Sequence, residues 1–142
     1  MTILFFALNI SIPLFVGLII YLICRPDAYV SSFIFKALHI PHNIFQIKRI
    51  TILTDFIKYY SCDILWAYSL TFILSFIVGQ KLSQSIIVSI IAISFESIVE
   101  LLQKSGIFPG TFDVLDIFFE IISSLSALFI IIKFIKNKVE DY

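Results

Sequence analysis

Acidic side chains are the residues of this chain best suited to do chemistry. Five of its ten acidic residues lie between Glu96 and Glu120, in a stretch that separates two long apolar runs. A carboxylate at or just inside a membrane boundary is energetically expensive unless something compensates its charge. These carboxylates are therefore the first candidates for a functional site.

The spacing of polar residues around this stretch follows the period of a helix. In both apolar runs, small and polar residues recur at every third or fourth position, which places them on one helix face. The first stripe consists of Ser85, Ser89, Ala92, Glu96, Glu100 and Gln103, and the second consists of Asp113, Asp116, Glu120, Ser123 and Ala127. Because small residues let transmembrane helices approach closely, both stripes are expected to face the inside of a helix bundle.

The link between the two runs is short, so the two helices should be antiparallel, with about 1.5 Å of depth per residue. The pairs expected at equal depth are Gln103 with Asp113, Glu100 with Asp116, and Glu96 with Glu120. Carboxylates held close together in a low dielectric do not all stay ionised without compensation. At least one of them is therefore expected to hold a proton, a cation or a basic side chain.

Two interpretations of these acids stay open at the level of sequence. In the first, they are interfacial acids that form salt bridges with Arg25, Lys58 or Lys104 and only fix the packing of the helices. In the second, they line a ligand or ion site. Asp63 has the same ambiguity, because it is either an N-terminal acid favoured by the helix dipole or one wall of that site.

The composition predicts an integral membrane protein. The chain has 142 residues, 60% of them hydrophobic and only 14% charged, and its mean hydropathy is +1.05. A soluble domain is roughly half apolar and about a quarter charged. Membrane barrels show short alternating segments between turns, and that pattern is missing here. The net charge is zero and the basic residues are not massed together, so no nucleic-acid footprint is present.

Four runs are long enough to cross a hydrocarbon layer about 30 Å thick. We predict an all-α bundle of four transmembrane helices, at about 3–24, 62–78, 82–102 and 114–134, in a single domain covering 1–142. The long connection between the first two helices is rich in Phe and Ile with isolated Lys and Arg. This pattern favours a segment that lies in the membrane interface.

Part of the chain resembles a known family. Glu-Leu-Leu-Gln, a glycine-containing turn and Phe-Asp-Val-Leu-Asp before an apolar helix are similar to the signature of VanZ-like membrane proteins, over roughly Cys62 to Phe134. The chain departs from that family at Gly110, Glu120, Ile64 and Ala67. The family motif maps onto Glu100, Gln103, Asp113 and Asp116, and Asp63 at the start of the second helix is grouped with them; we expect these residues to bind a ligand. Depth matching adds Glu120 to this set.

The resemblance implies a bacterial cell envelope protein in the cell membrane, linked to glycopeptide resistance in the namesake of the family. We therefore expect a non-catalytic accessory or binding protein with an acidic intramembrane cleft that handles glycopeptides or cell-wall precursors. Its expected partners are the lipid bilayer and a lipid-linked precursor or another membrane protein. No cofactor is expected. The alternative is a membrane hydrolase of a lipid-linked phosphate, in which the acids hold a divalent cation.

The orientation in the membrane stays open. One side of the predicted bundle carries Arg25, Lys36, Lys48, Arg49, Lys58 and Lys104, and the other carries Lys81, Lys133, Lys136 and Lys138. The excess of positive charge favours the first side as cytoplasmic. An envelope function would instead place the acidic end of the bundle outside.

Overall fold

The computed structural model describes residues 2–25, 29–39, 52–79, 81–108 and 110–140. Within these ranges the chain forms helices and no strand. The helices are α1 (Thr2–Cys24), α2 (Tyr29–Ala37), α3 (Ile52–Val78), α4 (Leu82–Lys104) and α5 (Val114–Glu140). Four of them, α1, α3, α4 and α5, are long and apolar enough to cross a membrane. The predicted all-α membrane architecture is confirmed.

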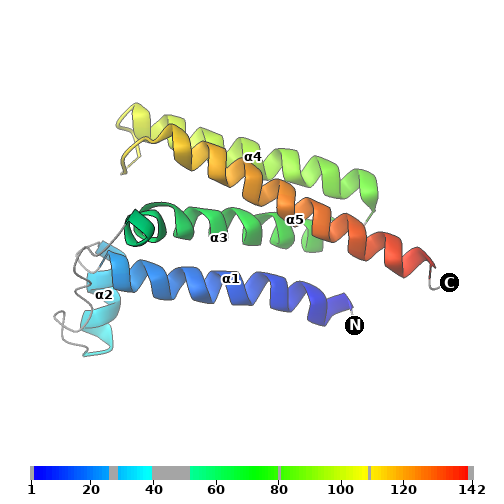
Figure 1. Ribbon diagram of the computed structural model, residues 1–142, viewed down its shortest axis with the longest axis horizontal. Coiled ribbons are helices and arrows are strands. Elements are labelled where there is room, and N and C mark those ends of the chain that lie inside the picture. The colour runs from blue at the N-terminus through cyan, green and yellow to red at the C-terminus, as the bar shows by residue number, and fades with distance from the viewer. Residues whose placement is uncertain (1, 26–28, 40–51, 80, 109, 141–142) are drawn as a thin grey trace.

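The four long helices run side by side along the molecule, and the short helix α2 lies across one end (Figure 1). The α4–α5 link lies at the same end as α2, whereas both termini and the α3–α4 link lie at the opposite end. We call the first end the acidic end, because Glu100, Asp113 and Asp116 belong to it. α3 is the central helix and packs against α1, α4 and α5.

The start of the second membrane helix differs from the prediction. α3 begins at Ile52, whereas the sequence pattern suggested a start at about residue 62. Asp55, Lys58 and two tyrosines interrupt the apolar run there, although they are compatible with a helix that extends beyond the hydrocarbon layer. Asp63 therefore lies well inside α3, and its interpretation as an N-terminal acid is wrong.

The connection between α1 and α3 contains the amphipathic helix α2. Ser31 and Phe35 are buried on one side of it, while Phe33 and Lys36 are exposed on the other. This arrangement suits a segment at a membrane surface, with an apolar side chain and a lysine both accessible to the interface. Residues 40–51, which complete the predicted interfacial segment, lie outside the described residues.

Close contacts attach α1 to α3. A Cβ placed on Gly17 would lie 3.5 Å from the Cβ of Leu65, so the two helices approach closely at this glycine. The hydroxyl of Tyr68 donates a hydrogen bond of 2.7 Å to Oδ1 of Asn9. Near the end opposite the acids, Phe6 packs in a buried cluster with Phe72, Ala127 and Ile131. The apolar core and the acids therefore occupy different ends of the bundle.

The turn between α4 and α5 is determined by local hydrogen bonds. Gly106 has a positive φ of 72°, and its N–H donates to the carbonyl of Gln103 at 3.0 Å. The N–H of Ile107 donates to the carbonyl of Leu102 at 3.1 Å. These are the two bonds of a Schellman C-cap, which ends α4 and reverses the chain.

Candidate functional site

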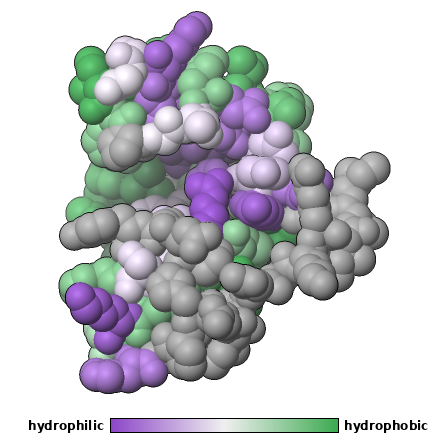
Figure 2. All heavy atoms as spheres, turned by 90° about the vertical axis from the view of Figure 1, so that its left-hand side faces the viewer, coloured by the Kyte–Doolittle hydropathy of each residue, from purple (hydrophilic) through white to green (hydrophobic). Residues whose placement is uncertain are grey.

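The helices bring six acidic side chains together near one end of the bundle. We call them the acidic site: Asp63 on α3, Glu96 and Glu100 on α4, Asp113 just before α5, and Asp116 and Glu120 on α5. Seen end-on, hydrophilic side chains lie near the middle of this face and also at its upper and lower edges, with hydrophobic side chains between them (Figure 2). The buried residues of α4 include Ser85, Ser89, Ala92, Glu96 and Glu100. The prediction that the α4 stripe faces the bundle is therefore confirmed for these five residues.

The outer part of the acidic site is organised around Asp113. Its Oδ1 accepts a hydrogen bond of 2.9 Å from the N–H of Leu115, so this carboxylate caps the start of α5. Its Oδ2 accepts a hydrogen bond of 3.2 Å from the hydroxyl of Tyr60 on α3. The backbone N–H of Asp113 donates to Oε2 of Glu100 at 3.4 Å. Asp113 thus joins the beginning of α5 to both α3 and α4.

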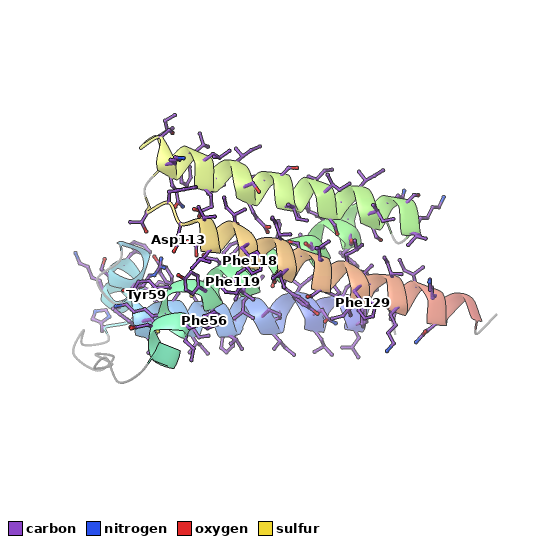
Figure 3. All side chains as sticks on the ribbon, turned by 45° about the horizontal axis from the view of Figure 1, so that its top comes forward. Phe56, Tyr59, Asp113, Phe118, Phe119 and Phe129 are labelled. Atoms are coloured by element: carbon purple, nitrogen blue, oxygen red, sulfur yellow. The ribbon has the colours of Figure 1, made fainter. Side chains whose placement is uncertain are left out.

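An aromatic group lies beside this outer part. The ring of Phe119 on α5 lies 5.1 Å from that of Tyr60 and 5.3 Å from that of Phe56, both on α3. Figure 3 shows Phe56, Phe118, Phe119 and Asp113 in the same region, where α3 and α5 begin. Phe56 and Phe119 thus pack against the ring of Tyr60, whose hydroxyl bonds Asp113.

The inner part of the acidic site consists of Glu96 and Glu120. Their side chains are only 8% and 9% exposed, and the two carboxyl groups interact electrostatically. Oε2 of Glu96 accepts a hydrogen bond of 3.3 Å from the hydroxyl of Ser124. Oε1 of Glu96 and Oε2 of Glu120 are buried without any hydrogen-bond partner. A buried acceptor without a partner costs about 1–3 kcal/mol.

Asp116 and Asp63 connect the two parts. Asp116 interacts electrostatically with Asp63, Glu100 and Asp113, and its Oδ1 is also buried without a partner. Glu100 interacts electrostatically with Asp116, and Glu96 with Glu120, but Glu120 interacts with Glu100 and Asp116 as well, so the depth pairing stays a prediction. The hydrogen bonds differ from this pairing, because Glu100 bonds the backbone of Asp113 and Glu96 bonds Ser124.

The nearby basic side chains do not form ion pairs with the acidic site. Arg25, at the end of α1, interacts electrostatically with Asp63 and Asp116 without a salt bridge to either in the described part of the chain. The Nζ atom of Lys104 lies 4.9 Å from the centre of the Phe112 ring. The Nζ atom of Lys58 lies 5.6 Å from the centre of the Tyr59 ring. Among the described residues these three basic side chains form no salt bridge with the acidic site, and the choice between the two interpretations stays a prediction.

Gln103 has a local contact in the turn. A Cβ placed on Gly110 would lie 2.6 Å from the Gln103 side chain, and Gly110 has a positive φ of 147°. Gln103 is half-buried and packs against this glycine. Gln103 therefore lies in the last turn of α4, against the link to α5, and its predicted pairing with Asp113 stays a prediction.

No protein-family model, curated protein or solved structure matches this chain. The function must therefore be argued from the geometry of the acidic site itself.

The geometry bears on the divalent cation of the hydrolase alternative. Among the described residues, no group of three or more His, Cys, Asp or Glu side chains is close enough together to hold a metal ion. The acids are instead distributed over α3, α4, the residue before α5 and α5 itself. This arrangement gives no support to a divalent metal centre.

A separate hollow lies on the opposite side of α3. It has a volume of about 320 Å³ and is lined by Leu8, Asn9, Ile12, Pro13, Leu65 and Tyr68, so it belongs to the contact of α1 with α3. Its lining is mostly apolar, and Asn9 and Tyr68 bond each other within it. It contains none of the six acids.

Sequence reasoning missed Tyr60 and Ser124 as partners of the acidic site. Ser124 lies four residues after Glu120, on the same helix face, and this spacing could have identified it. Tyr60 was assigned to the loop, because the start of α3 was placed too late. Arg25 was named as a basic candidate, and it is the one whose charge acts on the acidic site.

Proposed function

We propose that this multi-pass membrane protein is a non-catalytic accessory or binding protein, whose acidic site holds a cationic group of an envelope component or partner. One observation carries the proposal. Glu96, Asp116 and Glu120 each keep a buried carboxyl oxygen that has no hydrogen-bond partner among the described residues. Carboxyl groups in a membrane interior are expensive, and they usually mark a ligand or ion pathway.

The arrangement of the acids supports an organic cation as the ligand. An ammonium group presents several N–H donors around one charge, and facing carboxylates on two helices can accept them together. The half-buried Asp113, just before α5, belongs to the outer part of the acidic site, so it offers a first contact to a cation that enters from the acidic end. The rings of Tyr60 and Phe119 add aromatic surface, against which a cation is also stabilised.

The resemblance to VanZ-like proteins supports the envelope part of the proposal. The matched residues Glu100, Asp113 and Asp116 are half-buried or buried and close enough to interact, as a binding role for them requires. We accordingly place the protein in the bacterial cell membrane, where it handles a glycopeptide or a cell-wall precursor.

A binding experiment in nanodiscs tests the cation site. Dodecylammonium is the probe, and dodecanol is its neutral counterpart with the same alkyl chain. Isothermal titration calorimetry should show saturable binding of dodecylammonium only. Glu100→Gln combined with Asp116→Asn should weaken that binding at least about tenfold, which corresponds to about 1.4 kcal/mol. Asp55→Asn is the control for the loss of an acid elsewhere, because it neutralises an acid of α3 outside the acidic site.

Two results would contradict the cation site. Dodecanol could bind as well as dodecylammonium, or the double variant could bind dodecylammonium as tightly as the unmodified chain.

The envelope role needs a cellular measurement. Expression of the chain in a susceptible bacterium should lower the sensitivity of that bacterium to a glycopeptide antibiotic, and expression of the double variant should not. Equal sensitivity with and without the chain would reject that role.

A further inference from the structure

A second set of buried polar groups continues from the acidic site toward the opposite end of the bundle. Ser85 and Ser89 on α4 are 0% and 1% exposed, and Thr71 and Ser75 on α3 are both 0% exposed. The hydroxyls of Ser75, Ser85 and Ser89 have no hydrogen-bond partner in the described part of the chain, whereas Thr71 donates to the carbonyl of Ala67 at 3.1 Å. These four side chains are not part of the proposed cation site.

Antiparallel pairing arranges these groups in layers. α3 ends at Val78 and α4 begins at Leu82, so residues equally distant from this short link lie at similar depths. Ser75 is then level with Ser85, and Thr71 is level with Ser89. Each layer is four residues from the next, which is about 6 Å along the helix axis.

Ser124 connects these layers to the acidic site. Its hydroxyl lies 3.5 Å from the carbonyl oxygen of Ala67 on α3 and 3.3 Å from Oε2 of Glu96 on α4. Ala67 is in turn the acceptor of the Thr71 hydroxyl. A series of polar oxygen atoms thus begins at Glu96 and Glu120 and continues at Ser124. Beyond Ser124 it reaches first the layer of Thr71 and Ser89, and then the layer of Ser75 and Ser85.

Close helix packing does not explain the hydroxyl groups. Alanine would allow the same approach of the helices, as Ala92 and Ala127 do at 0% exposure. Each buried hydroxyl without a partner instead costs about 1–3 kcal/mol. Buried water bonds otherwise unsatisfied groups of this kind, and one water between two oxygens spans about 5.6 Å, which matches the separation of the layers.

We propose that a proton path runs through the interface of α3, α4 and α5. Glu96 and Glu120 exchange protons with the acidic end of the bundle. Enclosed water then carries these protons toward the α3–α4 link, and it is held by the hydroxyls of Ser89, Thr71, Ser85 and Ser75. In each transfer an O–H bond forms on the acceptor oxygen as one breaks on the donor, so no oxidant or reductant is needed. The other titratable groups facing the two glutamates are Glu100 on α4, Asp116 on α5 and Asp63 on α3, with Arg25 beyond them at the end of α1.

Proton flux into liposomes tests the path. The full chain is reconstituted into vesicles that enclose a pH-sensitive dye, and a potassium gradient with valinomycin supplies the driving potential. Acidification of the lumen should be faster than in protein-free vesicles. Glu96→Gln should reduce this flux at least about tenfold, and so should Ser85→Ala combined with Ser89→Ala. Ser126→Ala is the matched control, because this exposed hydroxyl bonds only the Ile122 carbonyl of its own helix.

Three results would overturn the proton path. The proton flux could equal that of protein-free vesicles, or neither variant could reduce it. The flux could also follow a sodium gradient instead of the proton gradient. If Glu96→Gln does not fold, as judged by its helical circular dichroism and elution volume, Glu120→Gln replaces it. The inference goes beyond the cation site and is tested separately. The paired serine variant should keep its dodecylammonium binding while it loses proton flux.

Discussion

At the scale of single residues, Ser124 is the side chain that best shows how the acids are held. Its hydroxyl bonds one oxygen of Glu96, while the other oxygen of that carboxyl has no partner. Hydrogen bonds between transmembrane helices contribute about 0.6 kcal/mol on average and up to about 1.7 kcal/mol. Ser124 therefore contributes to stability through a contact that joins α4 and α5.

We expect Ser124→Ala to lower the free energy of unfolding by about 1–2 kcal/mol, because Glu96 then loses its only hydrogen-bond donor among the described residues. Unfolding in detergent, followed by circular dichroism, measures this loss. Ser126→Ala, two residues further on, should change stability by less than about 0.5 kcal/mol. A similar loss in both variants would mean that the bond between Ser124 and Glu96 contributes nothing specific.

At the scale of elements, Asp113 determines where α5 begins. It caps the helix through Leu115, and it accepts the Tyr60 hydroxyl from α3. The Schellman turn at Gly106 then ends α4 at the depth that allows Glu100 to reach the backbone of Asp113. The two helix ends thus fix the outer acids relative to one another.

We expect Asp113→Ala to destabilise the protein by about 1–2 kcal/mol, because α5 loses its cap. Asp113→Asn should retain most of the stability, since asparagine caps helices about as well as aspartate and still accepts a hydrogen bond from Tyr60. Chemical denaturation of the two variants in detergent compares them. Equal destabilisation by both changes would show that the negative charge matters more than the cap.

At the scale of the whole molecule, the acids and the buried phenylalanine cluster lie toward different ends of the bundle. The acids lie near α2 and the α4–α5 link, while Phe6, Phe72 and Ile131 form a core toward the termini (Figure 1). Four crossings place both termini on the same side of the membrane and the α4–α5 link on the opposite side. The side from which a cation enters therefore depends on the orientation.

We expect single cysteines at Ser105 and Asn137 to be labelled from opposite sides of the membrane. Both positions are exposed, one beside the α4–α5 link and the other near the end of α5. A membrane-impermeant maleimide, added to oriented vesicles of a variant with Cys24 and Cys62 replaced by alanine, measures which side each faces. Labelling of both from the same side would contradict the four-crossing arrangement.

The sequence by itself was sufficient for the fold class, the four crossings and the inward face of α4. These features depend on long apolar runs and on a helical period that remains visible in a single chain, as with Ser85, Ser89, Glu96 and Glu100. The early start of α3 was not predictable, because Asp55 and Lys58 resemble loop residues until their helix is seen to extend beyond the apolar run.

Only the tertiary structure decided which acids have partners. Whether Glu96 bonds Ser124, or Lys104 reaches a carboxylate or an aromatic ring, depends on the rotation and depth of packed helices to within a few ångströms. Helical spacing places side chains on a face, but it does not give their distances to groups on another helix. For this reason, only the packed helices identify the carboxyl oxygens of Glu96, Asp116 and Glu120 that lack a hydrogen-bond partner among the described residues.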